Sequence, residues 1–406
     1  MSNSGPKTRP TVLSVEQALS MPYATRRFVE LGWRVIRVEP TARPDARTPG
    51  DPNRHIGRPF GGPGRNSYFV APNVGKEAIA LDLKSMAGQT QLFRILRELH
   101  VDVFCTNTMP ARHEALGIDY ATLSTVKPDL IWAGISALGL KYPEVPGYDP
   151  MMQALCGYMD LTGEKDGPPL QCGPPITDLK AGDEVFAQVL LALYERTQTG
   201  KGKCIDVAMG NGAVSWLLTF LPMLDMGSTA NEIKRNGNEH RQFIPTNSYP
   251  TADGYLFMAI GSDVQWSRLV QSPAFASLNE DGYRTNEGRR ADRDNLHRRI
   301  GAVMSKMSLA AVSAALSAAE IPHAPITTIE GVFDLPFVKE RVLTTQAPDG
   351  RVVRMPPAAV DTEFLEEQGR ALPFAPRYGE HTESVLREAG VSETELSALR
   401  KDEVIA

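Results

Sequence analysis

Short apolar runs alternate with stretches in which apolar residues recur every three or four positions along the first half of the chain. The runs have the length of buried strands, and the periodic stretches have the spacing of amphipathic helices. We expect strands at 34–39, 78–83, 101–105 and 130–135, and helices at 22–31 and 85–99. This order predicts an α/β fold, with a parallel sheet covered by helices and ligands at the carboxyl ends of its strands.

The pattern changes at about residue 225. Residues 248–255 have the composition of a turn between two strands, and helical stretches rich in Ala, Arg and Ser follow to about residue 320. We therefore expect a smaller α+β domain at 225–325, after a larger domain at 1–224 and before a tail at 326–406. The most apolar run, 213–226, is too short to span a bilayer and is interpreted as a buried helix.

Composition narrows the functional classes. The chain has 406 residues, 42% of them hydrophobic and 22% charged, with a net charge of −5. That balance is typical of a soluble globular protein and argues against nucleic acid or an anionic membrane as a partner. The four cysteines are far apart, so we expect neither a metal site nor disulfides. The polar segment 1–10 lacks a signal-peptide core, which favours a cytoplasmic location.

Asp178 is the strongest candidate for chemistry. Pro174 and Pro175 interrupt the chain, and an apolar-periodic run follows Asp178 as far as Arg196. The residue is therefore expected at a helix N-cap, where free N–H groups and the helix dipole would keep its carboxylate ionised. Such a carboxylate can attack an activated acyl group. The alternative is that Asp178 only caps the helix.

An ordered set of motifs extends from about residue 22 to the end of the chain. It comprises 78–83 with its following helix, 116–120, 146–149, 161–163, Asp178 with 181–182, 196–202 with 205–207, 250–255 and 379–382. In this order the motifs resemble those of the family III CoA-transferases. The resemblance implies a Rossmann-like large domain built from residues 1–224 and 326–406, with 225–325 as the small domain. It also implies an interlocked dimer with the active site near the subunit interface.

The resemblance gives Asp178 the role of nucleophile. The donor acyl-CoA would form a mixed anhydride with Asp178, and the released CoA thiolate would then give an aspartyl-CoA thioester. The acceptor acid would reverse these steps. The expected substrates are a CoA thioester, with succinyl-CoA as the donor, and a carboxylic acid, with no tightly bound cofactor.

Tyr148 bears on the main alternative within the same fold, an acyl-CoA racemase. Racemases of this type use the histidine of a Gly-His-Asp element as a base, and this chain has Gly147-Tyr148-Asp149 instead. A tyrosine with a pKa near ~10 is a poor base at neutral pH but can donate a hydrogen bond to an acyl oxygen. Tyr148 together with Asp178 therefore favours transfer.

The expected CoA pocket departs from the family pattern. The candidate CoA contacts are Arg37, Asn73, Lys76, Asn107 and Arg112. Glu77 stands where a phosphate-facing cation is usual. The opening strand and its turn also differ from the family pattern and are reduced to residues 19–22.

Two interpretations of these departures stay open. CoA could bind in another pose through Arg58, Arg65 or Arg112, with the glycines at 61, 62 and 64 as a weak phosphate cradle in a loop at 40–65. Alternatively, the partner is a related, non-identical subunit, as in succinyl-CoA:benzylsuccinate CoA-transferase. The Met-rich segment 151–155 would then line a pocket for a bulky acyl group, and aromatic degradation would be the context.

Two classes outside the family were also weighed. A nicotinamide-dependent dehydrogenase should have Gly-x-Gly-x-x-Gly after its first strand, and this chain does not. A non-catalytic subunit of a heteromeric CoA-transferase would explain the eroded motifs, but the retained Asp178 argues against it.

Overall fold

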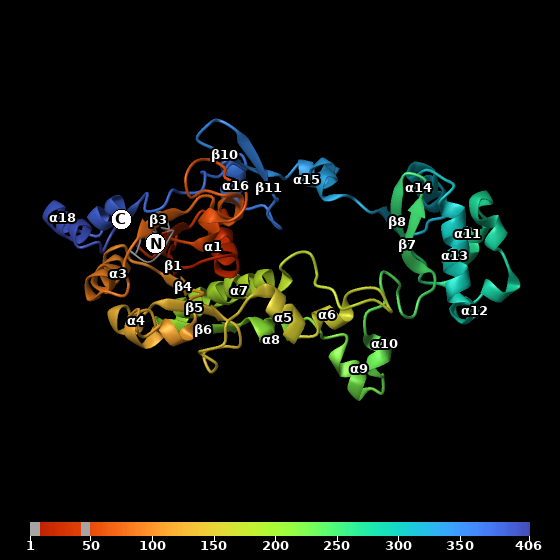
Figure 1. Ribbon diagram of the computed structural model, residues 1–406, viewed down its shortest axis with the longest axis horizontal. Helices are drawn as coiled ribbons and strands as arrows, with labels where there is room; N and C mark the ends of the chain where they lie inside the picture. The colour runs from red at the N-terminus through yellow and green to blue at the C-terminus, as the bar shows by residue number, and fades with distance from the viewer. Residues whose placement is uncertain (1–8, 42–48) are drawn as a thin grey trace, which may run out of the picture. The chain divides into compact units, whose positions relative to one another are not determined.

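The computed structural model describes residues 9–41 and 49–406 and divides the chain into two compact units (Figure 1). The large unit comprises Met1–Cys156, Gly173–Leu218 and Pro336–Ala406, and the small unit comprises Gly157–Cys172 and Thr219–Leu335. Parts of the expected polar N-terminus and of the expected loop at 40–65 lie outside the described residues.

A six-stranded sheet forms the centre of the large unit. Its order is β3-β2-β1-β4-β5-β6, and every neighbouring pair is parallel. The strands are β1 Thr11–Val15, β2 Arg34–Glu39, β3 Glu77–Ala80, β4 Val103–Thr106, β5 Ile131–Ser136 and β6 Lys203–Ala208. The expected α/β fold with a parallel sheet is confirmed. The expected erosion of the opening strand is wrong, because β1 lies upstream of 19–22, in the middle of the sheet.

Alternating side chains on the strands separate two apolar layers. Val12, Val35 and Val103 contribute to one core, whereas Leu13, Ile36 and Phe104 contribute to the other. The first core includes residues of α1 Ser20–Glu30 and α7 Ile176–Thr199. The second includes residues of α3 Met86–Glu98, α4 Tyr120–Val126, α17 Thr382–Glu388 and α18 Glu393–Lys401. Helices therefore cover both faces, and the last helices of the chain complete the second core.

Shorter elements complete the large unit. They are η1 Pro52–His55, α2 Ser67–Asn73, η2 Pro110–Arg112, α5 Asp149–Leu155, α8 Met209–Ser215, α15 Pro336–Lys339, β10 Leu343–Gln346, β11 Val352–Met355 and α16 Glu363–Glu367. Strands β10 and β11 form an antiparallel pair.

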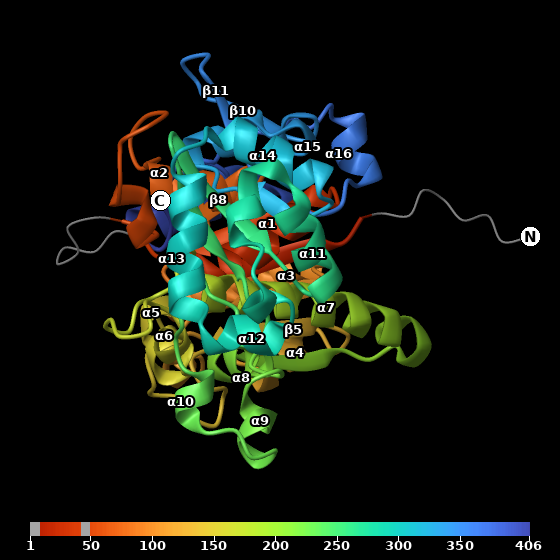
Figure 2. The ribbon, with the colours of Figure 1, turned by 90° about the vertical axis from the view of Figure 1, so that its right-hand side faces the viewer.

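The small unit is built on an antiparallel sheet, β7-β8-β9, beside a helical layer that includes α11, α13 and α14 (Figure 2). One apolar core that includes Leu256, Trp266 and Ile300 holds it together. Its elements are α6 Tyr158–Leu161, α9 Leu221–Asp225, α10 Ala230–Ile233, β7 Thr246–Thr251, β8 Gly254–Ala259, α11 Asp263–Gln271, η3 Pro273–Leu278, η4 Asp281–Tyr283, α12 Asn286–Ala291, α13 Arg293–Met304, α14 Leu309–Ala318, β9 His323–Pro325 and η5 Ile329–Asp334.

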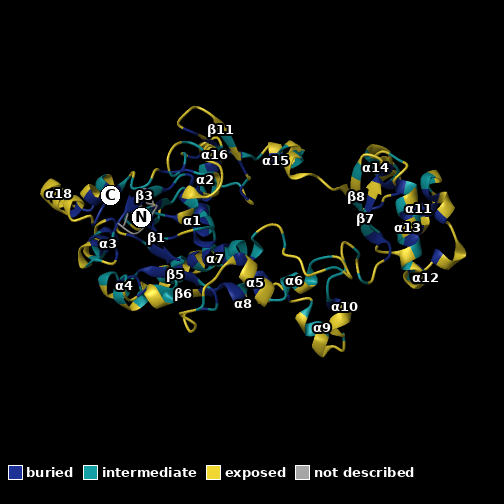
Figure 3. Ribbon diagram, in the orientation of Figure 1, coloured by how far each residue is buried: buried dark blue, intermediate teal, exposed yellow. Residues whose placement is uncertain are grey.

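The expected buried helix at 213–226 is wrong. The segment contains the end of α8 and the short helix α9, in which Pro222 lies in the first turn. Trp216, Leu218 and Met226 are 51%, 76% and 81% exposed (Figure 3). Several apolar side chains of this segment are exposed, so its composition did not indicate burial.

No single helix among the described residues is long and apolar enough to cross a membrane. Helices α13 and α14 meet that test of length and composition only as a pair, and the pair is bent by 115°.

Helices α1 and α7 approach each other closely near the start of both helices. A Cβ atom on Gly182 would lie 2.7 Å from Cδ1 of Tyr23 and 2.8 Å from the carbonyl oxygen of Ser20. Ala181, the preceding residue, is fully buried. The first turns of α7 therefore pack directly against the start of α1, which follows β1.

Replacing Gly182 with Val should destabilise the large unit by about 1–3 kcal/mol, because the backbone of α1 cannot yield to the added atoms. Gly212→Ala in α8 is the matched control, since its Cβ would meet only Cγ of Lys180, at 3.7 Å. The control should be neutral or stabilising by up to about 1 kcal/mol. Denaturant unfolding measures both, and equal stability of Gly182→Val and wild type would contradict the packing argument.

Candidate active site

A cavity of about 990 Å³ opens at the carboxyl ends of the parallel strands. Its lining includes residues that directly follow strands, namely Glu16, Gln17, Ala18, Pro40, Leu81, Asn107 and Ala137. Tyr148, Asp178 and Met209 close another part of the wall. This is the edge at which open parallel sheets bind ligands.

The predicted site residues fall into two groups. Asp178, Tyr148, Asn107 and Arg112 line this cavity. Arg37, Asn73 and Lys76 are 0%, 0% and 4% exposed and do not line it. The structure thus brings together four of the seven residues around one space.

Asp178 lies in the first turn of α7 but is not its N-cap. The helix begins at Ile176, and its N-cap is Pro175, which has no side-chain cap. The acceptor comes instead from Asp149, whose Oδ1 accepts hydrogen bonds from Thr177 N at 2.8 Å, Thr177 Oγ1 at 2.7 Å and Asp178 N at 3.3 Å. The capping prediction is wrong because a carboxylate 29 residues earlier takes that role.

The electrostatics of Asp178 also differ from the sequence expectation. Burial, and then the negative charge of Asp149, raise the pKa of the Asp178 carboxyl from 3.8 to about 7. The helix dipole does not keep the pKa of this carboxyl low, because burial and the negative charge of Asp149 both favour its protonated form. Asp178 is therefore close to half ionised at neutral pH.

Tyr148 and Asp149 are adjacent but lie in different surroundings. Tyr148 is the N-cap residue of α5 and is 66% exposed beside the cavity. Asp149 is 6% exposed, and its Oδ2 accepts a hydrogen bond from Gln153 Nε2 at 2.6 Å. From the sequence, Asp149 was placed in a motif without a role. Pro150 was the local signal that a helix begins at this point.

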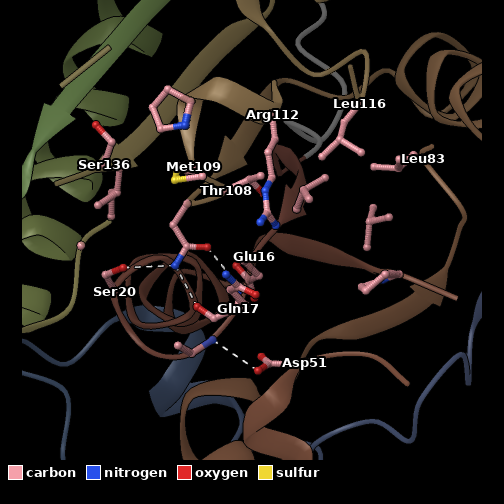
Figure 4. Close-up of a pocket in the computed structure, with 18 of the residues that line it drawn as sticks. Glu16, Gln17, Ser20, Asp51, Leu83, Thr108, Met109, Arg112, Leu116 and Ser136 are labelled. Atoms are coloured by element: carbon pink, nitrogen blue, oxygen red, sulfur yellow. Dashed lines mark hydrogen bonds between the residues drawn. The ribbon is translucent and has the colours of Figure 1, made fainter. Parts of the chain in front are cut away.

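The Gln17–Ala18 turn is a second part of the site that sequence reasoning missed. Asn107 accepts a hydrogen bond from Gln17 N at 3.0 Å and donates to Gln17 O at 2.8 Å (Figure 4). Ala18, at φ 59°, donates its N–H to Asp51 Oδ1 at 3.3 Å. Asn107 and Asp51 thus hold Gln17 at the cavity wall, and the Asn107 amide is engaged in that task.

Arg37, Asn73 and Lys76 belong to a buried ionic network behind this wall. Lys76 donates to Glu16 Oε1 at 2.7 Å, and Arg37 donates to Asp51 Oδ2 at 2.8 Å and to Asn73. Burial lowers the pKa of Lys76 to about 8. Arg37 and Lys76 neutralise carboxylates of the protein itself, Asn73 accepts hydrogen bonds from both, and all three offer a ligand almost no surface.

Cations that do face the cavity are Arg112 and Lys84 (Figure 4 labels Arg112). Sequence reasoning missed Lys84, which follows β3 by four positions. Arg65 is buried beside the Phe374 ring, and neither it nor Arg58 lines the cavity. Within the described residues, no group of three or more His, Cys, Asp or Glu side chains could hold a metal ion.

The expectation for Glu77 is wrong. Glu77 is the first residue of β3 and accepts hydrogen bonds from Arg34, the first residue of β2, at 2.7 and 3.0 Å. Both residues lie at the amino ends of the strands, opposite the cavity. Glu77 therefore cannot repel a phosphate bound at the carboxyl ends, and the main argument for a degraded CoA site is removed.

Comparison with known proteins agrees with this architecture. The model of CoA-transferase family III matches residues 10–382. The chain is 30% identical to succinate–glutarate CoA-transferase of Agrobacterium fabrum, over 93% of this chain and 94% of that protein. It is 30% identical to succinyl-CoA:glutarate CoA-transferase of Mus musculus, over 93% and 85%. The crystal structure of a CAIB/BAIF family protein from Brucella suis aligns with a TM-score of 0.81 and 28% identity, over 94% of this chain and 98% of that one.

The raised pKa of Asp178 predicts a pH-dependent cost of folding. The folded chain holds the proton up to about pH 7, whereas the unfolded carboxyl releases it near 3.8, so this group lowers the free energy of unfolding as pH rises between those values. Asp178→Asn should therefore gain stability relative to wild type by at most about 1.4 kcal/mol for each pH unit in that interval. Denaturant unfolding from pH 4 to 8 measures the difference.

Glu184→Gln on the same helix is the control of opposite sign. The hydrogen bond from Lys180 lowers the pKa of the Glu184 carboxyl, so removing it should cost stability as pH rises. A stability difference between Asp178→Asn and wild type that does not vary with pH would show that Asp178 has an ordinary pKa.

Proposed function

The chain belongs to CoA-transferase family III, an enzyme family that transfers coenzyme A between acids, and we propose that it moves CoA from succinyl-CoA to a dicarboxylic acid with Asp178 as the nucleophile. The observation that carries the proposal is the Asp178 carboxyl itself. It lines the cavity at the strand ends, and no described residue donates a hydrogen bond to its carboxylate. A carboxylate that is positioned but not engaged is free to attack.

The proposed reaction exchanges acyl groups on Asp178 in four steps. The carboxylate attacks the succinyl-CoA carbonyl carbon, and the CoA thiolate leaves as a mixed anhydride forms. The thiolate then attacks the aspartyl carbonyl carbon, which releases succinate and leaves an aspartyl-CoA thioester. The acceptor carboxylate attacks that thioester, and the thiolate finally attacks the acceptor acyl carbon and frees Asp178. Exclusion of water from the cavity protects both anhydrides.

The developing oxyanions need hydrogen-bond donors from the cavity wall. The N–H groups of Thr177 and Asp178 are engaged by Asp149 and do not serve. We assign this role to the Tyr148 hydroxyl and the Gln17 carboxamide, which line the cavity. Arg112 and Lys84 are the proposed phosphate contacts of CoA, since they are the cations on the described part of the lining.

We propose a short dicarboxylate as the acceptor acid in preference to benzylsuccinate. The names of the two curated relatives above specify glutarate. The methionines at 151 and 152, which suggested a pocket for a bulky acyl group, are 48% and 1% exposed and do not line the cavity. Glutarate is therefore the first acceptor to test, and benzylsuccinate the second.

Intact-protein mass spectrometry after incubation with succinyl-CoA tests the nucleophile. Wild type should gain the mass of CoA less water, and added glutarate should discharge the adduct with formation of glutaryl-CoA. Asp178→Asn should form no adduct and lose transfer by several orders of magnitude. Asn at this position leaves the Asp149 cap intact, so a loss reports chemistry rather than folding.

Three other outcomes would redirect the proposal. Transfer by Asp178→Asn at the wild-type rate would remove Asp178 as the nucleophile. Discharge of the adduct by benzylsuccinate but not by glutarate would restore the bulkier acceptor. Exchange of the α-proton of an acyl-CoA for deuterium without any adduct would favour the racemase.

We also propose an interlocked dimer. The large unit exposes apolar side chains along α7, with Leu190, Leu191 and Tyr194 at 37%, 45% and 65%. An interlocked pair should bury much more than a standard interface of about 1,600 Å². Because the Glu77 argument for a non-identical partner is removed, an identical subunit is the simpler partner.

The dimer should therefore persist at nanomolar concentration. Mass photometry of the purified chain should give one species of twice the chain mass, in low and in high salt. A monomer at these concentrations would contradict the dimer, and a dimer that forms only with a co-expressed paralogue would restore the heteromeric interpretation.

A further inference from the structure

The Asp149 carboxylate is the most heavily engaged side chain near the proposed nucleophile. It is 6% exposed and accepts hydrogen bonds from Thr177 N, Thr177 Oγ1, Asp178 N and Gln153 Nε2, between 2.6 and 3.3 Å. It lies at the start of α5 and bonds to the start of α7. One carboxylate therefore links the segment that carries Tyr148 to the turn that carries Asp178.

We propose that Asp149 is a positioning residue of the transferase, which caps α7 in place of Asp178 and so leaves the Asp178 carboxylate free at the cavity wall. The inference rests on the proposed function. It assigns different roles to two neighbouring carboxylates: Asp149 caps the helix, and Asp178 is the nucleophile.

Helix geometry explains why Asp178 needs this help. Asp178 is the third residue of α7, where an acidic side chain commonly turns back to accept the N–H of the N-cap residue. Here the N-cap is Pro175, and proline has no N–H to donate. The N–H groups of Thr177 and Asp178 are the other local donors, and Asp149 holds both. Pro175 thus removes one N–H that could bind the Asp178 carboxylate, and Asp149 accepts hydrogen bonds from the other two.

Charge gives Asp149 a second effect on the same group. Burial is the larger cause of the raised pKa of Asp178, and the Asp149 charge adds to it. The other charged groups nearby pair among themselves: Lys180 with Glu184 on α7, and Asp183 with Tyr23 and Arg27 of α1. Asp149 is therefore the charge that acts on Asp178, and it makes the carboxylate more basic and a stronger nucleophile once ionised.

Asp149→Asn separates geometry from charge. The side-chain amide oxygen in this variant can still accept hydrogen bonds from Thr177 and Asp178, while the negative charge is removed. We expect the acid limb of kcat/KM to move down by about one pH unit and the plateau rate to fall, with little change in KM for succinyl-CoA. Glu184→Gln, on the same helix and outside the cavity, should leave the pH profile unchanged.

Pro175→Ala tests the other half of the arrangement without touching either carboxylate. The new N–H gives Asp178 an intramolecular partner, so the pKa of its carboxyl should fall and kcat should drop while the fold is kept. An unchanged pH profile in both Asp149→Asn and Pro175→Ala would overturn the proposal, and so would a loss of rate in Asp149→Asn with no shift of the acid limb.

A readout without turnover separates this inference from the proposed function. The stability gain of Asp178→Asn should increase with pH and level off near pH 7 when Asp149 is present, and should level off about one pH unit lower when Asp149→Asn is also present. If Asp178 is not the nucleophile, no CoA adduct forms but this coupling remains. If the adduct forms and the coupling is absent, the function stands and the role of Asp149 is wrong.

Discussion

A buried carboxylate needs donors or cations, and this requirement organises the carboxyl edge of the sheet. Glu16 and Asp51 face Lys76 and Arg37, and the same Asp51 fixes the turn at Ala18. Asp149 receives its donors from α5 and α7. Asp178 differs from them, because burial and then the charge of Asp149 raise the pKa of its carboxyl. The buried carboxylates Glu16, Asp51 and Asp149 have donors or cations as partners, whereas the Asp178 carboxylate has none among the described residues.

The sheet could be predicted from the sequence because its strands carry apolar residues on both faces, as Val35 and Ile36 of β2 do. The strand β1 was missed because it has five residues and two of them, Thr11 and Ser14, are polar. The boundaries of α3 were predicted to within one residue and those of α7 to within three, since Ser85 and the prolines before Ile176 are local signals. Local signals failed at 213–226, where apolar composition does not distinguish a buried face from an exposed one.

The site was harder to predict, for reasons that are physical. Asp178 could be found because its place before a periodic helix is local, whereas its cap, Asp149, is supplied across 29 positions. Arg37 and Lys76 have the side chains that bind phosphate, but the same chemistry serves to neutralise Glu16 and Asp51 inside the protein. Residue type gives the charge; only the fold gives its direction. Glu77 illustrates this, because it lies at the amino end of β3, and the length of that strand separates it from the carboxyl edge where a phosphate would bind.

The last helices of the chain, packed into the second core of the large unit, constrain how the protein is made. Leu386 and Leu396 share that core with Leu13 and Ile36, and Ile405 bridges to Leu81. A ribosome must therefore complete the whole small unit before the last helices can cover their part of the sheet, so one apolar face of that sheet stays partly uncovered during synthesis. Contacts between residues more than three hundred positions apart also make folding of the large unit slow. Nascent chains of this protein therefore expose apolar surface of the kind that chaperones bind. Truncation after the small unit would leave the second core of the large unit incomplete and part of its apolar surface exposed.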